Sequence, residues 1–331
     1  MPDDPASTAS GFVVGHAQHR EHHTGCTVIL CPPGTVAGVD VRGPAPGSRE
    51  TDLLAPDKPI ARLDALLFTG GSAFGLAAAD GVMRFLAEAG AGFPTQVKPI
   101  PLVAASVIYD LLLSGGAAYP DAELGYAACR AARALPLPPA AQGNAGAGAG
   151  ATVGKWGGPA AMMKGGIGYS ERRAGDAHVA ALAVVNAVGD VVAEDGGVLA
   201  GARDADGGWL AAATPERWLP RRELFPGTNT TLAAVLTDAT LSKPQAARLA
   251  QRAHDGIARA VLPAHTDHDG DTAYALAAGT REAPFDMVGV QAVACVSEAI
   301  RNAVRHAAPA AGLPGLCSGT TAQMETPRGP G

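Results

Sequence analysis

Short strand-like segments alternate with helix-like segments along the whole chain of 331 residues. The strand-like segments are β-branched and bounded by turns, and the helix-like ones repeat apolar residues every three or four positions. No linker separates them into two groups, and 47% apolar residues suffice for one large core. This order predicts a single layered α/β domain over residues 11–313, with flexible tails at 1–10 and 314–331.

The same patterns place the individual elements. Two details are more specific: residues 178–185 and 190–193 are expected to pair as a hairpin, and residues 164–168 to form a turn. Residues 204–227 are expected to be an irregular surface loop. We expect strands at residues 12–14, 26–31, 36–41, 64–68, 178–185, 190–193 and 273–278, and helices at residues 76–89, 122–134, 241–260 and 290–307.

Charge and cysteine usage narrow the class of protein. The net charge of −6 comes without a basic stripe, which argues against a nucleic-acid partner. The five cysteines form no metal or redox motif, as is typical of reduced thiols. No apolar run reaches the roughly 18 residues of a membrane span, and no secretory signal opens the chain. We therefore expect a soluble cytoplasmic protein without a cofactor.

A polar turn, Gly227-Thr228-Asn229, leads directly into the apolar segment that starts at Thr230-Thr231. A threonine hydroxyl is a weak nucleophile without a base nearby. Cleavage of the chain before a threonine supplies that base, because the freed α-amino group has a pKa near 8. On these residues alone, an ordinary turn into a strand is the more frequent explanation.

Two carboxylates, Asp269 and Asp271, flank Gly270 where another strand begins. Two such neighbours need a cation, and either Lys155 or a new α-amino group on Thr230 would serve. The alternative is a metal loop, for which Asp267, His265 and His268 are further candidate ligands. The calcium-loop pattern fails because its twelfth position is Ala278, and no third ligand accompanies the histidines, so we expect no metal.

Two glycine-rich stretches precede these motifs. Residues 69–75 are expected to form the turn between the strand at 64–68 and the helix at 76–89. The backbone N–H groups of Gly70 and Gly71 can hold an oxyanion there, or the glycines can simply allow a tight turn. Residues 143–154 alternate glycine and alanine, which indicates either a close backbone approach or a flexible linker. A linker leaves the lysine at its end, Lys155, without a role.

Taken together, the motifs resemble the P1-family (S58-type) self-processing peptidases, the L-aminopeptidase/D-esterase group. The threonine-nucleophile branch of nylon-oligomer hydrolases is most similar, and the resemblance covers about residues 11–307. The motifs that carry it include Thr24-Gly25-Cys26-Thr27-Val28, Thr69-Gly70-Gly71-Ser72-Ala73-Phe74-Gly75-Leu76, Tyr119-Pro120-Asp121, Gly148 to Lys155, Lys164-Gly165-Gly166, Asn186, Asn229-Thr230-Thr231 and His265 to Thr272.

The resemblance implies a four-layer αββα sandwich, similar in layout to N-terminal-nucleophile hydrolases. It implies self-cleavage between Asn229 and Thr230 into an α chain (1–229) and a β chain (230–331), which stay together and assemble into a homo-oligomer, with a tetramer favoured. By the same resemblance Thr230 is the nucleophile, Asp269 and Asp271 are its acidic pair, and Lys155 and Asn186 support them. Asp269 stands where the serine-using branch has a serine.

The implied mechanism is hydrolysis of a small peptide or amide through an acyl-enzyme. Asn186 and the N–H groups near Gly70 and Gly71 are expected to stabilise the oxyanion, and the acidic pair to orient Lys155 and the ammonium. Two alternatives remain open: an amino-acid N-acyltransferase of related architecture, and an uncleaved, non-catalytic homologue that binds a ligand.

Overall fold

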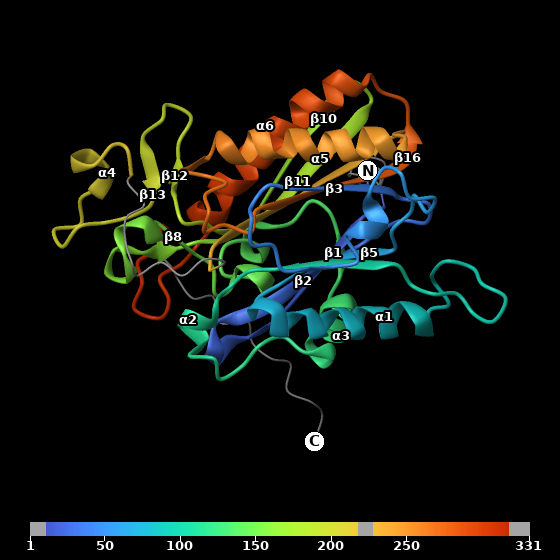
Figure 1. The fold of residues 1–331 in the computed structure, drawn as a ribbon, viewed down its shortest axis with the longest axis horizontal. Coiled ribbons are helices and arrows are strands. Elements are labelled where there is room, and N and C mark those ends of the chain that lie inside the picture. Colours follow the sequence, from blue (N-terminus) through green and yellow to red (C-terminus); the bar gives the residue numbers. More distant parts are fainter. Residues whose placement is uncertain (1–10, 218–227, 318–331) are drawn as a thin grey trace, which may run out of the picture.

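The computed structural model describes residues 11–217 and 228–317 of the chain. Two sheets lie face to face, and two long helices cover each of their outer faces (Figure 1). This arrangement confirms the predicted four-layer αββα sandwich. The helices are α1 (Ala78–Glu88) and α3 (Ala122–Arg130) on one side, and α5 (Lys243–Ala258) and α6 (Phe285–Arg305) on the other.

The six-stranded sheet under α1 and α3 has the order β4-β6-β5-β2-β1-β7. All neighbouring strands are antiparallel except β5 and β6. After β5 the chain passes through the predicted glycine turn and a 3₁₀ segment into α1. The strands are β1 (Val13–His19), β2 (Thr24–Leu30), β4 (Ser48–Arg49), β5 (Ala65–Thr69), β6 (Val103–Val107) and β7 (Arg133–Ala134).

The five-stranded sheet under α5 and α6 has the order β10-β11-β14-β16-β3. Its neighbours β14 and β16 are parallel, and the other pairs are antiparallel. Parallel neighbours begin at the same edge of a sheet, so the starts of β14 and β16 lie side by side. The strands are β3 (Val36–Val41), β10 (Gly166–Ala174), β11 (Ala177–Asn186), β14 (Thr230–Ala239) and β16 (Thr272–Arg281).

The apolar core forms three layers, and the two-residue period of β11 shows how they arise. Ala181, Ala183 and Val185 face the helices α5 and α6, whereas Leu182 and Val184 face the other sheet. Every residue of β11 and β14 is buried, because each strand is covered on both faces. Burial of each valine or leucine side chain stabilises the fold by about 1.5–3 kcal/mol.

The helix over residues 241–260 confirms its predicted start. Ser242 caps α5, and Gln245 completes a capping box with it. Helix α6 begins at Phe285, earlier than expected, because Pro284 is its N-cap. Gly289 lies inside this helix, where the side chain of Arg252 packs against it.

The predicted hairpin after residue 185 is wrong. Strand β12 (Asp190–Val192) pairs with β13 (Val198–Ala200) and β15 (Val261–Leu262), whereas β11 lies between β10 and β14. The connecting residues bond elsewhere: Gly154 and Trp156 donate to the carbonyls of Gly189 and Val188. The chain therefore leaves the sheet after Asn186 instead of folding back on it.

The predicted turn at residues 164–168 is also wrong, because Lys164 ends β9 (Met163–Lys164) and β10 starts at Gly166. The glycines there serve close packing: a Cβ on Gly168 would lie 2.0 Å from the carbonyl oxygen of Ala299 in α6. β9 pairs with β8 (Thr152–Val153).

The glycine–alanine stretch at 143–154 is packed inside the fold, which excludes the linker alternative. Lys164 holds it, because its buried ammonium donates to the carbonyls of Ala149 and Ala151, both at 2.8 Å. Burial lowers the pKa of Lys164 to about 7, and Asp110 opposes that change.

Three segments complete the description. Within the expected loop at 204–227, residues 204–217 carry the short helix α4 (Leu210–Ala213), and α2 (Leu111–Ser114) follows β6. Residues 218–227, 1–10 and 318–331 lie outside the described residues. Of the expected C-terminal tail, residues 314–317 are described, and Pro314 accepts a hydrogen bond from the N–H of Lys164.

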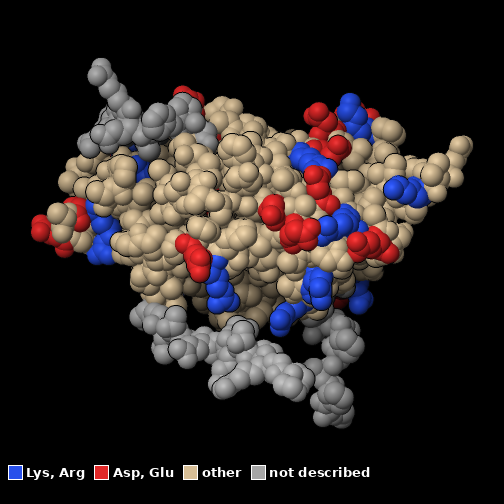
Figure 2. Space-filling view, turned by 90° about the horizontal axis from the view of Figure 1, so that it is seen from below, with Lys and Arg blue, Asp and Glu red and all other residues tan. Residues whose placement is uncertain are grey.

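Acidic and basic side chains lie next to one another on the face that Figure 2 shows. Ion pairs among the described residues include Arg84 with Glu123 and Arg49 with Asp80. Within the described ranges, no helix is both long and apolar enough to cross a membrane.

Candidate active site

Thr230 is the first residue of β14 and lies opposite Asn186, the last residue of β11. Its side chain is buried together with that of Thr231. Beyond Thr230 the sequence is apolar or β-branched, so the strand starts where the polar turn ends. Thr230 therefore lies at the end of the five-stranded sheet where β14 and β16 both begin, next to the loop that precedes β16.

The peptide carbonyl of Asn229 has two donors. The hydroxyl Oγ1 of Thr230 lies 2.5 Å from this carbonyl oxygen, and the N–H of Gly270 donates to it at 2.8 Å. A hydrogen-bond donor on a carbonyl oxygen withdraws electron density from its carbon, which favours attack by a nucleophile. The Thr230 hydroxyl therefore lies next to a polarised carbonyl at the Asn229–Thr230 bond.

Gly270 is needed at its position for a steric reason. A Cβ there would lie 2.6 Å from the carbonyl oxygen of Ala45 and 3.0 Å from Oγ1 of Thr230. The absence of a side chain lets the loop before β16 approach both Thr230 and the segment after β3.

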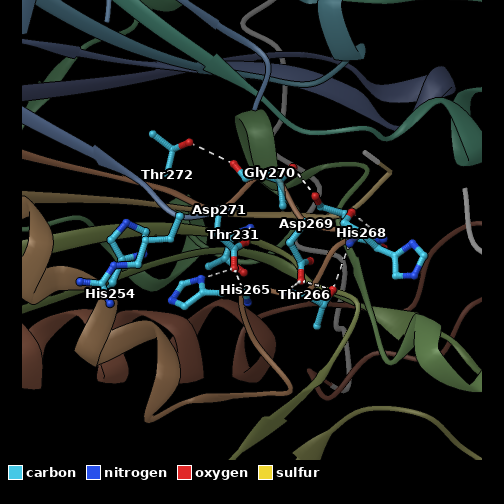
Figure 3. Close-up of polar contacts among 12 residues, drawn as sticks. Thr231, His254, His265, Thr266, His268, Asp269, Gly270, Asp271 and Thr272 are labelled. Carbon is cyan, nitrogen blue, oxygen red and sulfur yellow. Dashed lines mark hydrogen bonds and ion pairs between the residues drawn. The ribbon is translucent and has the colours of Figure 1, made fainter. Parts of the chain in front are cut away.

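The two acidic residues beside Gly270 have different partners (Figure 3). Asp271 accepts from the N–H of Thr231 at 2.6 Å, and from both Nδ1 and the backbone N–H of His265 at 2.8 and 3.1 Å. Asp269 accepts from the N–H and the hydroxyl of Thr266, at 2.9 and 2.7 Å. Both carboxylates are buried, so these bonds replace the lost water.

Burial and, to a smaller extent, the charge of Asp271 together raise the pKa of Asp269 to about 6. The hydrogen bonds from Thr266 and the charge of Lys155 oppose this shift. Asp269 is thus a carboxylate that changes protonation state near neutral pH, a property common among catalytic groups.

Lys155 is buried beside Asn186. Its ammonium donates to the backbone oxygen of Asn186 at 2.7 Å and to the side-chain oxygen Oδ1 at 2.8 Å. Burial lowers the pKa of Lys155 to about 7, although Asp269 acts in the opposite direction. Among the described residues, Lys155 makes no ion pair with Asp269 or Asp271, so the expected direct orientation of the lysine by the acidic pair is not seen.

Asn186 connects the lysine to the segment before the Asn229–Thr230 bond. Its Oδ1 also accepts from the N–H of Thr152 at 3.1 Å, while its Nδ2 donates to the carbonyls of Tyr109 at 3.1 Å and Thr228 at 3.4 Å. These contacts fix which end of the amide points toward residues 228–230. The donor end does so, as an oxyanion role requires.

The expected oxyanion role of Gly70 and Gly71 does not fit the observed hydrogen bonds. The N–H of Gly70 donates to the carbonyl of Gly25 at 2.8 Å, and that of Gly71 donates to Oδ1 of Asp110 at 2.7 Å. Both donors are already used within the fold. The tight-turn alternative explains these glycines, since Gly71 has a φ of +80° and crowds Tyr119.

His265 and Thr266 contact the acidic pair, and the sequence alone did not assign them this role. His265 was considered only as a metal ligand. Within the described residues there is no group of three or more histidine, cysteine or acidic side chains that could hold a metal ion. The available signal was proximity in sequence, because His265 and Thr266 precede the acidic pair by a few residues.

Comparisons with known proteins identify the family of this chain. A model of peptidase family S58 matches residues 9–317. The chain therefore belongs to this family, and it is a hydrolase of peptide or amide bonds. An uncharacterized aminopeptidase of Mycobacterium leprae is 39% identical, over 96% of this chain and 94% of the relative. A 6-aminohexanoate-oligomer endohydrolase of Kocuria sp. is 34% identical, over 80% of this chain and 72% of the relative.

Solved structures show the same fold at lower identity. A β-aminopeptidase of Burkholderia sp. has a TM-score of 0.67 and 23% identity, covering 95% of this chain and 90% of the other. An L-aminopeptidase D-Ala-esterase/amidase of Ochrobactrum anthropi, described as a variant of the Ntn-hydrolase fold, has a TM-score of 0.68 and 20% identity. It covers 90% of this chain and 85% of the other, so the fold is that of this group.

Proposed function

We propose that the chain cleaves itself between Asn229 and Thr230 and then uses Thr230 as the N-terminal nucleophile of an aminopeptidase or amidase. The observation that carries this proposal is the pair of contacts on the Asn229 carbonyl. The hydroxyl of Thr230 lies at 2.5 Å from its oxygen, and the N–H of Gly270 donates to the same oxygen. Family membership supports hydrolysis of an amide rather than simple ligand binding.

In the cleavage step, Oγ1 of Thr230 attacks the carbonyl carbon of Asn229 and loses its proton to a nearby base. The C–N bond breaks, the nitrogen takes up a proton, and the chain is joined by an ester. Water then hydrolyses this ester, which frees the Asn229 carboxylate and the α-amino group of Thr230. Asp269 is the base that we assign to this step, because its backbone pairs with Asn229 beside the bond to be cut and its pKa is raised to about 6.

In the mature enzyme, the α-amino group of Thr230 takes the proton from Oγ1 as the hydroxyl attacks a substrate amide. We assign the oxyanion to Gly270 N–H, which already donates to the Asn229 carbonyl, in place of Gly70 and Gly71. Asn186 Nδ2 joins it as a second donor once its 3.4 Å bond to the Thr228 carbonyl is released. The amine product leaves with a proton, and water hydrolyses the acyl-enzyme. The named activities of the relatives, aminopeptidase and 6-aminohexanoate-oligomer endohydrolase, suggest small peptides or linear amides as substrates.

Denaturing electrophoresis and intact-mass measurement test the proposal. The purified protein should consist of two chains, one that ends at residue 229 and one that begins at residue 230. Thr230→Ala should remain one chain and lose amide hydrolysis, whereas Thr230→Ser should keep both reactions. A wild-type protein that hydrolyses amides at full rate as one uncut chain would rule the mechanism out.

A further inference from the structure

Among the described residues, the side-chain carboxylate of Asp271 accepts three hydrogen bonds, and two of them come from His265. His265 donates to the same oxygen, Oδ2, through its ring Nδ1 at 2.8 Å and through its backbone N–H at 3.1 Å. The other oxygen accepts the N–H of Thr231 at 2.6 Å. Because a carboxylate only accepts, the Nδ1 atom of His265 must carry a hydrogen.

The backbone of His265 is held in a conformation that serves this contact. Its φ of +56° lies in the left-handed region, which is uncommon for residues other than glycine, although asparagine, aspartate and histidine adopt it more often than the rest. This conformation lets the ring and the N–H of one residue reach one carboxylate oxygen. Backbone conformations of this kind persist where surrounding structure enforces them, and they concentrate at functional sites.

A second histidine supports the ring of His265 from α5. The ring of His254 lies edge-on to it, with centroids 4.8 Å apart and planes at 70° (Figure 3). His254 faces the carbonyl of Asp40 at 3.0 Å through Nε2, and burial lowers its pKa to about 4. A neutral ring at this place packs against His265 without adding charge beside Asp271.

We infer that His265 is a positioning residue, which fixes the Asp271 carboxylate on the N–H of Thr231 and thereby sets the position of the neighbouring Thr230 hydroxyl. The inference rests on the proposed function, because it assigns a means of alignment to the proposed nucleophile. It also divides the roles of the acidic pair. The Asp271 carboxylate receives three N–H donors and is held in place, whereas that of Asp269 is bonded, among the described residues, by Thr266 alone and is left to exchange the proton.

Four substitutions separate the hydrogen bond from the backbone conformation. His265→Asn keeps a donor near the position of Nδ1 and tolerates a positive φ, so kcat/KM should stay within about threefold of wild type. His265→Gly accepts the φ but has no donor, and His265→Ala lacks the donor and strains the backbone. His265→Gln places its amide too far along the side chain. All three should lose about ten- to a hundredfold in kcat/KM, as expected for a lost hydrogen bond to a charged group.

The pH profile gives a readout that a purely structural role would not change. Loss of the Nδ1 donor makes the doubly ionised Asp269–Asp271 pair less favourable, so its first protonation occurs at higher pH. The acid limb of kcat/KM should therefore move upward by about one pH unit in His265→Gly and His265→Gln, but not in His265→Asn. Among the described residues, Lys155, whose charge acts on Asp269, and His254 with its neighbours Asp40 and Arg42 are the same in every variant. Asp267 and His268, the other titratable side chains of the loop before β16, are also unchanged.

The control is His178→Asn, a buried histidine at the opposite end of β11 from Asn186, which should leave rate and pH profile unchanged. If His265→Gly does not fold, the comparison of asparagine with glutamine still decides the question. Equal rates and equal acid limbs for these two variants would overturn the positioning role. Chain splitting in the wild type tests the proposed function separately: a split, active wild type with indifferent His265 variants refutes only the present inference.

Discussion

Replacing Lys155 by methionine should stabilise the folded chain at neutral pH and remove part of its pH dependence. The pKa of Lys155 falls from 10.5 to about 7 because the ammonium is buried. At about 1.36 kcal/mol per pKa unit, burial of the charged form costs about 5 kcal/mol. Methionine removes this cost but also the hydrogen bonds to Asn186, each with a net contribution of about 1 kcal/mol.

The pH dependence isolates the lysine from these constant terms. Between its folded and unfolded pKa values, the folded state binds fewer protons than the unfolded state, so stability rises with pH through this window. From about pH 7 to about pH 9, the free energy of unfolding of the wild type should therefore rise by about 2–3 kcal/mol relative to Lys155→Met. Below about pH 7 the difference between the two should stop changing.

Chemical denaturation in the uncleavable Thr230→Ala background provides the assay, because the chain then remains one polypeptide. Lys164→Met is the matched control: its ammonium is also buried on backbone carbonyls with a pKa of about 7, so the same change in slope is expected. A stability difference for Lys155→Met that stays constant from about pH 7 to pH 9 would refute the reasoning, since it would mean that Lys155 stays charged throughout.

Three further substitutions test individual atoms of the site. Asp269→Asn should lose activity yet gain about 1–3 kcal/mol of stability near neutral pH; the gain should appear as pH rises from about 4 to 6, because the folded pKa of Asp269 is raised to about 6. Gly270→Ala should slow self-cleavage, followed by electrophoresis over time, since its Cβ would crowd Ala45 and Thr230. Thr231→Val should raise the unfolding free energy by about 1 kcal/mol, because the Thr231 hydroxyl is buried without a hydrogen-bond partner among the described residues. Self-cleavage should continue in this variant, because its backbone N–H remains.

Much of the layered fold could be predicted because local patterns and global arrangement agree. The strand at residues 178–185 and the helix at residues 241–260 were predicted from local patterns, and the structure has β11 and α5 there. The hairpin after β11 could not be excluded locally, because the competing partners of residues 187–189 lie more than thirty positions earlier, in the segment that contains Gly154 and Trp156.

The candidate site was predictable in composition but not in its contacts. Thr230, Asp269 and Asp271 lie together because β14 and β16 are parallel neighbours, and the sequence contains no local signal for that pairing. Lys155 donates to Asn186 rather than to the carboxylates, a contact between residues 31 positions apart that local patterns do not predict. For Gly70 and Gly71 the sequence predicted an oxyanion role, whereas their N–H groups donate to other groups of the fold and stabilise the turn.

The strand order of the five-stranded sheet has a consequence for the order of folding and cleavage and for the stability of the cleaved protein. Strands β14 and β16 follow the proposed cut, yet they lie between β11 and β3, which precede it. The two fragments of the proposed cleavage therefore contribute interleaved strands to one sheet. Neither fragment can dissociate unless the hydrogen bonds between these strands break. The chain must fold before it is cut, and separated products would have to find this interleaved arrangement as two molecules. The cleaved protein would then be kinetically stable: it persists because it unfolds slowly, and we expect its unfolding to be irreversible.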